Sequence, residues 1–196
     1  MPSNDSDPLG RHDWHSQNYV REWIDRYHGD TRDLEAILST LAVEPPERVL
    51  DVGAGYGRLA RVVLERFPRS RVVVQDFSVP MLAQAAAYLV DVAERYTTAN
   101  VDLRDSDWPR AVGTDFDAVV SAIAIHNVRD PNLIAQIYRG VFECLRPGGR
   151  FVDVDLIEPE HAPEHLGWLR EAGFDSVNAQ AEVLDANRML LIARRP

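Results

Sequence analysis

Apolar residues recur along this chain with two different spacings. Near the N-terminus they follow a helical spacing in two segments, 20–27 and 34–41, which predicts two amphipathic helices. Beyond Pro46, short continuous apolar runs alternate with further stretches of helical spacing. Such runs are typical of strands that are buried on both faces. They predict strands at 48–52, 71–77, 97–103, 117–125 and 150–156.

The segments between these strands predict helices with recognisable ends. Pro68 closes the helix after the first strand, and Ser78 is a suitable N-cap for the helix after the second. Asp130 and Pro131 supply the cap and first turn of a helix that runs to Leu145. A further helix and two strands are expected near the end of the chain, at 164–172, 176–182 and 189–194.

This alternation predicts an α/β fold. Strands separated by helices pair in parallel, so we expect a doubly wound, mostly parallel sheet of seven strands, with the last two as an antiparallel pair. The two N-terminal helices precede this alternation. We expect one structural domain in which 1–44 forms a tail and helices that cover the ligand site, and 45–196 forms the ligand-binding part. The ligand should bind at the carboxyl ends of the early strands.

Composition narrows the classes of partner. The 196 residues suffice for one well-buried domain. A formal net charge of −10 would repel a phosphate backbone, so nucleic acid is not expected as a partner. The chain has no signal-peptide pattern and no apolar run of the roughly 20 residues that a membrane helix needs, so we expect no membrane association and a cytoplasmic location. The single Cys144 lies in an apolar helical pattern, which favours a buried structural thiol.

The stretch VLDVGAGYGRLA, residues 49–60, predicts a strand, a glycine turn and a helix. Such a turn normally binds a nucleotide, but the dinucleotide pattern G-x-G-x-x-G would need glycine where this chain has Arg58. The carboxylate of Asp51 would oppose a pyrophosphate and favour a cation, which makes a dehydrogenase a distant alternative. No P-loop lysine follows. A phosphate-free nucleoside with a cationic arm fits better, and S-adenosylmethionine is the common one.

Together with four later motifs, this stretch resembles the class I S-adenosylmethionine-dependent methyltransferases. The later motifs are VVVQDFS for the acidic second strand, NVDL for the adenine-contacting turn, LRPGGRF for the entry to the fifth strand and LREAGF for a helix near the end. The resemblance covers about residues 49–151 and is to small-molecule methyltransferases of the ubiquinone and menaquinone biosynthesis type. It implies a Rossmann-like fold, S-adenosyl-L-methionine as cofactor, S-adenosyl-L-homocysteine as product, and a small-molecule acceptor.

The resemblance gives several residues a role on the methionyl side of the cofactor. Asp51 would face the ammonium group, directly or through water. The backbone of the glycine turn would lie against the methionyl part, and carbonyls at the end of the fourth strand would border the sulfonium. These backbone contacts would come from Gly53, Ala54, Gly55, Ser121 and Ala122.

On the nucleoside side, the resemblance implies that Asp76 accepts hydrogen bonds from both ribose hydroxyls, since one ionised carboxylate has acceptor sites for two donors. Phe77 and Met81 would be apolar neighbours of the ribose and the adenine. Asp102 would accept a hydrogen bond from the adenine amino group, while the amide of Leu103 would donate one to a ring nitrogen.

Some of these residues also have plainer interpretations. The glycines could serve tight turning alone, and Asp76 could be a helix-capping acid. Asp105 and Asp107 lie close to Asp102 in the sequence, so the local match can shift. Trp108 either shields the edge of the adenine or is a core tryptophan.

Methyl transfer from a sulfonium needs little besides placement of the acceptor, and a base is required only when the acceptor must lose a proton. His126 follows the fourth strand and is one candidate base, although it could also cap the loop or pack beneath the site. Asp155, near the carboxyl end of the fifth strand, is the other. Asp153 shares its face one pleat deeper and could mark an alternating, partly exposed strand. No metal is expected, because no obvious third ligand accompanies either of the pairs His12/His15 and His161/His165.

The connection between the fifth strand and the next helix is short. Seven residues, IEPEHAP at 157–163, separate these elements, whereas many relatives have a helical insertion here that covers the acceptor pocket. Either the N-terminal helices with Trp14, Tyr19 and Trp23 close the site, or it stays open for a bulky acceptor, a homodimer or a partner subunit. Two hypotheses follow: a methyltransferase that acts on oxygen, nitrogen or carbon of a small molecule, and an S-adenosylmethionine-binding regulatory or partner-dependent protein.

Overall fold

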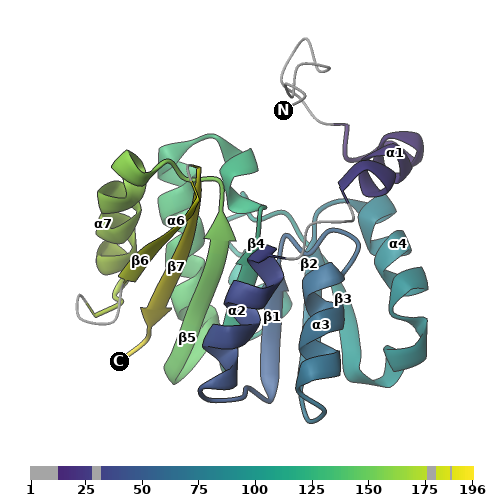
Figure 1. Ribbon diagram of the computed structural model, residues 1–196, viewed down its shortest axis with the longest axis horizontal. Coiled ribbons are helices and arrows are strands. Elements are labelled where there is room, and N and C mark those ends of the chain that lie inside the picture. Colours follow the sequence, from purple (N-terminus) through teal and green to yellow (C-terminus); the bar gives the residue numbers. More distant parts are fainter. Residues whose placement is uncertain (1–12, 28–31, 176–179, 186) are drawn as a thin grey trace.

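The computed structural model describes residues 13–27, 32–175, 180–185 and 187–196, with a seven-stranded sheet at its centre (Figure 1). The strands are β1 (Arg48–Val52), β2 (Arg71–Asp76), β3 (Tyr96–Asn100), β4 (Phe116–Ala122), β5 (Leu145–Asp155), β6 (Gln180–Asp185) and β7 (Arg188–Arg194). Their order across the sheet is β3-β2-β1-β4-β5-β7-β6. The strands β1 to β5 are parallel, and β7 is antiparallel to both β5 and β6. The expected doubly wound sheet with an antiparallel C-terminal pair is confirmed.

Helices cover both faces of this sheet (Figure 1). They are α1 (Gln17–Tyr27), α2 (Arg32–Ala42), α3 (Arg58–Arg66), α4 (Val79–Tyr88), α5 (Trp108–Val112), α6 (Pro131–Cys144) and α7 (Ala162–Ala172), with the 3-10 helices η1 (Val90–Arg95), η2 (Ile125–Val128) and η3 (Pro159–His161). Buried side chains of α2, α3 and α4 form one apolar cluster with one face of the sheet, and those of α5, α6 and α7 form another with the opposite face. The domain is therefore a three-layer α/β sandwich.

The predicted helix caps are present. The side chain of Ser78 accepts a hydrogen bond from the amide of Met81 at the start of α4, at 3.1 Å. The side chain of Asp130 accepts one from the amide of Asn132 at the start of α6, at 2.9 Å. These bonds satisfy amides that have no partner inside the helix, so both helices begin where the sequence predicts.

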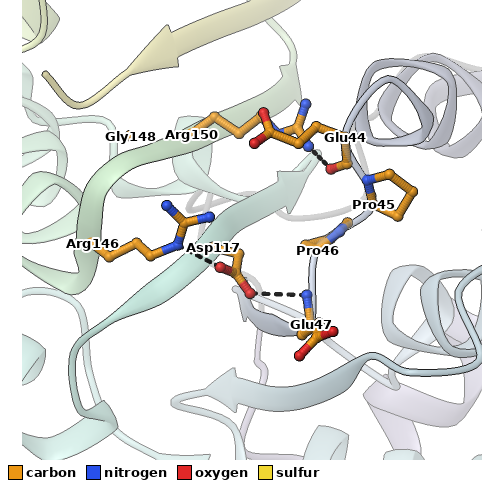
Figure 2. A pocket seen from close by; sticks show the side chains of 8 residues that line it. All are labelled: Glu44, Pro45, Pro46, Glu47, Asp117, Arg146, Gly148 and Arg150. Atoms are coloured by element: carbon orange, nitrogen blue, oxygen red, sulfur yellow. Dashed lines mark hydrogen bonds and ion pairs between the residues drawn. The ribbon is translucent and has the colours of Figure 1, made fainter.

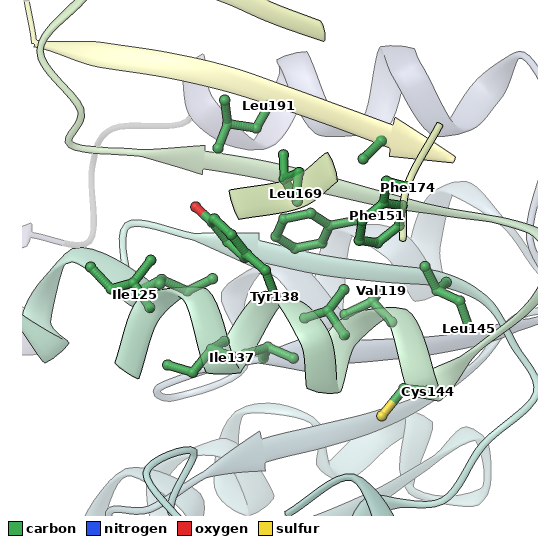
Figure 3. Close-up of a cluster of buried hydrophobic side chains, with 14 of the residues drawn as sticks. Val119, Ile125, Ile137, Tyr138, Cys144, Leu145, Phe151, Leu169, Phe174 and Leu191 are labelled. Atoms are coloured by element: carbon green, nitrogen blue, oxygen red, sulfur yellow. The ribbon is translucent and has the colours of Figure 1, made fainter. Parts of the chain in front are cut away.

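The apolar cluster that α6 and α7 form with the sheet contains several residues that were considered in the sequence analysis (Figure 3). The rings of Tyr138 and Phe151 lie 5.7 Å apart and are fully buried. Burial raises the pKa of Cys144 to about 12, in agreement with a structural thiol. Trp108 is 2% exposed and packs on α6 at Gly140, where an added Cβ would lie 2.5 Å from the indole ring. Trp108 is therefore a core residue.

Several element ends differ from the sequence expectation. The fourth strand ends at Ala122 rather than 125, because Ile123 has φ +53° and breaks the extended backbone. The third strand ends at Asn100, whose side-chain amide turns back to donate to the carbonyls of Asp76 and Phe77. The helix that follows Ser78 ends at Tyr88 and gives way to a kinked 3-10 segment, although the apolar spacing of Leu82, Ala85, Ala86, Leu89 and Ala93 would allow a longer helix. Of the strand expected at 176–182, residues 176–179 lie outside the described residues, and β6 continues to 185.

The sheet reverses its winding between β1 and β4. The chain runs outward from β1 to β2 and β3 and then returns to β4 on the other side of β1. Ligands of such sheets bind at this reversal, outside the carboxyl ends of the strands. The helix α1 lies at the same end of the molecule, above α4 (Figure 1). None of the described helices is long and apolar enough to span a membrane.

Candidate active site

The glycine turn after β1 is tied to the end of β2 by backbone hydrogen bonds. Gly53, Gly55 and Gly57 all have positive φ, at +62°, +56° and +85°, which side-chain-bearing residues rarely adopt. The amide of Ala54 donates to the carbonyl of Gln75 at 2.8 Å, and the amide of Gly55 donates to Oδ2 of Asp76 at 2.8 Å. The structure thus brings the predicted glycine turn and the predicted ribose-binding acid together.

Two residues that the sequence reasoning missed support this turn. The side-chain oxygen of Gln75 accepts from the amide of Gly53 at 2.9 Å, and its nitrogen donates to the carbonyl of Val101 at 2.6 Å. The side chain of Asn100 holds the carbonyls that follow β2, as described above. A signal was present for Gln75, since it is a buried amide within an otherwise apolar strand.

The loops after β1 and β4 meet at the winding reversal. A Cβ atom added to Gly53 would lie 2.5 Å from the Cβ of Ala124. We expect Gly53→Ala to lower the free energy of unfolding by about 1–3 kcal/mol, because it combines this overlap with an unfavourable φ, and to weaken binding of S-adenosylhomocysteine. Thermal unfolding and calorimetric titration measure both effects.

A matched control for this substitution exists on α7. At Gly167 an added Cβ meets no atom within 4 Å, and φ is not positive. We expect Gly167→Ala to stabilise the protein by about 0.5–1 kcal/mol, because alanine is the better helix former, and to leave binding unchanged. Equal stability and equal binding of the two variants would contradict the role given to the contact between Gly53 and Ala124.

Two buried carboxyl groups flank the glycine turn. Asp51 is 1% exposed, and its Oδ2 accepts from the amide of Ala60 in α3 at 2.9 Å. Burial, with a smaller contribution from the nearby charge of Asp76, raises the pKa of Asp51 to about 8 despite this hydrogen bond. Burial also raises the pKa of Asp76, which accepts from the amides of Gly55 and Ser78. Two acids that share a buried crevice favour a cationic ligand over an anionic one.

The raised pKa values of Asp51 and Asp76 predict that ligand binding depends on pH. An ammonium group beside Asp51 would favour the ionised carboxylate, so binding below the pKa of about 8 must release a proton. We expect the affinity for S-adenosylhomocysteine to rise up to about tenfold per pH unit below that pKa and to level off above it. Calorimetry in buffers of different ionisation enthalpy counts the protons released, and Asp51→Asn should remove most of the effect. An affinity that does not vary with pH would contradict the placement of the ammonium group.

On the predicted adenine side, the structure groups Phe77 with three polar side chains. The guanidinium of Arg104 lies 5.7 Å from the centre of the Phe77 ring, and the His15 ring meets that ring edge-on at 5.5 Å. Arg104 also binds both carboxylate oxygens of Asp102, at 2.5 to 3.0 Å, which lowers the pKa of Asp102. Leu103 is half-buried against the core. The role of Asp102 toward adenine stays a prediction, and Arg104 is a neighbour that the sequence reasoning missed.

Apolar contacts of Met81 link α1 to the glycine turn. Met81 is 3% exposed and forms a small apolar cluster with Val20 of α1 and with Tyr56 of the glycine turn. The backbone carbonyl of Trp14 accepts from the Ser78 hydroxyl at 2.5 Å. In contrast, α2 packs on the face of the sheet beside α3. The expectation that 1–44 covers the site therefore has support only for the segment around α1, and the division of the chain at 44/45 stays a prediction.

Beyond β4 the backbone is strained. Ser121 is fully buried, Ala122 ends the strand, and Ile123 then has φ +53°, which is rare for a β-branched residue. The amide of Ile123 still donates to the carbonyl of Val154 at 2.8 Å. Such backbone conformations persist where the surroundings enforce them, and they gather at functional sites. This one directs the following loop, with His126, back over the end of β5.

The two candidate bases form one unit. Nδ1 of His126 lies 2.6 Å from Oδ1 of Asp155, and the backbone amide of His126 donates to Oδ2 at 2.8 Å. The amide of Leu156 adds a third hydrogen bond to this carboxylate. The Asp155 side chain is 2% exposed and that of His126 is 26% exposed. Asp155 thus orients the imidazole, and Nε2 is the nitrogen left for an acceptor molecule.

Asp153 does not lie on a partly exposed strand, so that interpretation was wrong. It is fully buried, because α6 and α7 cover this face of β5. Within the described residues neither of its carboxylate oxygens makes a hydrogen bond, although the Ser121 hydroxyl is near. Burial, together with the charge of Asp155, raises the pKa of Asp153 well above its ordinary value. This favours the neutral form of Asp153.

A cavity of about 250 Å³ lies at the opposite, amino edge of the sheet (Figure 2). Its charged groups already have partners: Arg146 binds Asp117, which also accepts from the amide of Glu47. Arg150 donates to the carbonyl of Glu44 and to carbonyls at the end of α2. These contacts fasten α2 to β5, so this cavity is not the candidate site. Within the described part of the chain, no group of three or more potential metal ligands is found.

A family model described as a methyltransferase domain matches residues 50–151, more than half of the chain. The chain belongs to the class I S-adenosylmethionine-dependent methyltransferase family. It is 31% identical over 162 residues to a trans-aconitate 2-methyltransferase of Rhodopseudomonas palustris, which covers 83% of this chain and 57% of that protein. It is 34% identical over 121 residues to a demethylmenaquinone methyltransferase of Thermus thermophilus, which covers 61% of this chain and 52% of that protein.

This methyltransferase chain also shares its fold with solved structures. A Burkholderia thailandensis 1,6-didemethyltoxoflavin-N1-methyltransferase with bound S-adenosylhomocysteine superposes with a TM-score of 0.68 at 22% identity, covering 90% of this chain and 86% of that one. The resemblance read from the sequence is confirmed, and S-adenosylmethionine is the cofactor of the family. The chain spans about half the length of the two curated relatives. The roles of the individual site residues stay predictions.

Proposed function

We propose that this methyltransferase transfers a methyl group from S-adenosylmethionine to an oxygen, nitrogen or carbon atom of a small-molecule acceptor. The observation that carries the proposal is the meeting, at one edge of the sheet, of an acid-flanked glycine turn and the pair His126–Asp155. The first can hold a cationic nucleoside, and the second can hold a proton.

The chemistry of the residues around the glycine turn suits the cofactor. At Gly55 an added Cβ would be in ordinary van der Waals contact with the sulfur of Met81, at 3.8 Å, so the positive φ rather than crowding requires glycine here. Each oxygen of Asp76 already accepts one backbone amide and retains capacity for a ribose hydroxyl. Asp51 would hold the ammonium group. When bound, S-adenosylmethionine supplies an electrophilic methyl group on a sulfonium.

The residues of this chain would then place the acceptor and take its proton. Asp155 accepts a hydrogen bond from Nδ1–H of His126, so the neutral imidazole presents an unprotonated Nε2. Nε2 can accept a proton from a hydroxyl or acidic carbon at the moment that atom attacks, and the imidazolium then faces the ionised Asp155. Placement contributes roughly 7–11 kcal/mol to such a reaction, and a positioned base contributes a further rate factor of about 10²–10⁴.

The proposal is tested by incubating the chain with S-adenosylmethionine and a panel of hydroxylated, aminated and activated-carbon small molecules. Formation of S-adenosylhomocysteine and of a product heavier by one methylene unit, detected by mass spectrometry, supports it. The rival hypothesis is an S-adenosylmethionine-binding protein with little activity of its own. Tight binding of S-adenosylhomocysteine without turnover of any acceptor would favour that rival, although the relatives reported above are named as methyltransferases.

The cytoplasmic location and the assembly state also belong to the proposal. The connection from β5 to α7 consists of residues 156–161 and is even shorter than the sequence indicates, because α7 begins at Ala162. It offers little cover for an acceptor. A homodimer or a partner subunit that completes the pocket is therefore part of the hypothesis, and light scattering with and without S-adenosylhomocysteine tests it.

A further inference from the structure

A second histidine, His165, forms a hydrogen-bonded pair with Tyr138 near His126–Asp155, and this pair has no role in the function proposed so far. The hydroxyl of Tyr138, on α6, lies 2.7 Å from Nδ1 of His165, in the first turn of α7. Figure 3 shows the Tyr138 oxygen at the end of its ring that points away from Cys144 and Leu145. Burial raises the pKa of Tyr138, and the nearby charge of Asp155 adds to this effect, so Tyr138–His165 and His126–Asp155 share one electrostatic environment.

The direction of the hydrogen bond between Tyr138 and His165 follows from burial. Tyr138 is fully buried, and burial raises its pKa well above the ordinary value, so the phenol keeps its proton. Among the described residues, Nδ1 of His165 is the acceptor that the structure gives this proton. If His165 donated instead, the phenolic proton would be buried without a partner, which costs free energy. Tyr138 therefore donates, and His165 carries its proton on Nε2.

His126 is held in the opposite tautomer. Its partner Asp155 is a carboxylate, which accepts hydrogen bonds and donates none. The proton of the neutral His126 imidazole is therefore on Nδ1, and Nε2 is bare. A carboxylate behind one histidine and a phenol behind the other thus favour opposite tautomers of the two neutral imidazole rings.

We propose that His165 is a second acceptor-binding residue, whose Nε2–H donates a hydrogen bond to the molecule that His126 deprotonates. The proposal rests on the function proposed above. It assigns the acceptor to a chemical class: a weak acid with an ionisable hydroxyl and a second, hydrogen-bond-accepting oxygen, such as a hydroxy-carbonyl compound. Tyr138 is then a positioning residue, which acts through His165.

The surroundings of His165 support a neutral donor. Its ring is half-buried and lies 4.9 Å from that of Trp168, and Nε2 is on the side of the ring away from Tyr138. Burial lowers the pKa of His165, while the charges of Asp155 and Glu164 act against this effect and that of His161 reinforces it. A neutral imidazole suits a carbonyl or ether oxygen better than a carboxylate, which would prefer a charged partner.

The tautomers can be measured without any acceptor molecule. Long-range proton–nitrogen correlation spectra of the full chain, assigned with His126→Asn and His165→Asn, report which ring nitrogen carries the proton near neutral pH. We expect Nδ1 for His126 and Nε2 for His165. A His165 that is protonated on Nδ1, or on both nitrogens, would overturn the proposal whether or not the chain proves to be a methyltransferase.

A matched pair of variants tests the positioning role. Tyr138→Phe removes the phenol but keeps the buried ring, so we expect His165 to become a mixture of tautomers. Tyr88→Phe removes a hydroxyl from a tyrosine on α4 that is 45% exposed, and should leave both histidines unchanged. Thermal unfolding confirms that each variant is folded. A His165 spectrum that is the same in Tyr138→Phe as in the parent would show that the phenol does not position it.

The acceptor class is tested with a matched pair of probes. In the presence of S-adenosylhomocysteine, we expect 3′-hydroxyacetophenone, whose hydroxyl cannot donate to its own carbonyl, to bind about tenfold more tightly than 3-ethylphenol, which has the hydroxyl but lacks the carbonyl. His165→Phe, which keeps a ring against Trp168, should remove the difference. Equal binding of the two probes, or binding of neither, would overturn the assigned class, while loss of S-adenosylhomocysteine binding itself would instead contradict the proposed function.

Discussion

Replacing His126 with glutamine is expected to lower the rate of methyl transfer to a hydroxyl acceptor by about 10²–10⁴-fold. The substitution removes the nitrogen that would take the proton, while the backbone amide of residue 126 can still donate to Asp155. Binding of S-adenosylhomocysteine should remain within about twofold, because the imidazole is not part of the cofactor crevice. Single-turnover kinetics and calorimetry separate the two effects.

His161→Gln is the matched control for this substitution. His161 is exposed, lies in η3 at the same edge of the sheet and makes no side-chain cap to α7. We expect it to change the rate by less than about twofold, as is usual for surface positions. If His126→Gln retains the full rate with a hydroxyl acceptor, the imidazole is not the base. A rate loss shared equally by His161→Gln would point to a general disturbance of this edge.

Replacing Asp76 with alanine is expected to weaken binding of S-adenosylhomocysteine by about 100-fold or more. The change would remove the two charge-assisted hydrogen bonds to the ribose that we predict, each contributing about 1.5–3 kcal/mol, and it also frees the amide of Gly55. Isothermal titration measures the affinity directly. Turnover of any acceptor should fall in parallel when S-adenosylmethionine is not saturating.

Asp91→Asn is the comparison for this loss. Asp91 is an exposed acid in η1, paired with Arg61 on the surface, where such pairs contribute little to stability. Its substitution should leave the affinity unchanged. An affinity for S-adenosylhomocysteine that survives in Asp76→Ala would remove the ribose contact from the proposal and favour the interpretation of Asp76 as a helix-capping acid.

The fold could be predicted from the sequence because its strands are buried on both faces. Continuous apolar runs marked β1, β2 and β4 within a few residues. The ends of the strands were less predictable, because they depend on tertiary contacts. β4 stops where Ile123 takes a left-handed backbone, a conformation that its β-branched side chain gives no reason to expect.

The candidate site could be predicted only in part. The glycine turn, Asp51 and Asp76 lie in short contiguous motifs, so their neighbourhood is set locally. The pairs His126–Asp155 and Tyr138–His165 join residues 29 and 27 positions apart, and only the packing of α6 and α7 on β5 brings them together. The sequence therefore gives His126 and Asp155 as separate candidates, whereas in the structure Asp155 orients the imidazole of His126.

The hydrogen bond between the Ser78 hydroxyl and the Trp14 carbonyl has a practical consequence. Because the Ser78 amide also donates a hydrogen bond to Asp76, the segment at Trp14 would form a wall of the predicted ribose site. Detachment of this segment and exchange of S-adenosylhomocysteine for S-adenosylmethionine would then occur together. A purification tag is accordingly better attached at the C-terminal end, whereas shortening that end would remove β7 from the sheet.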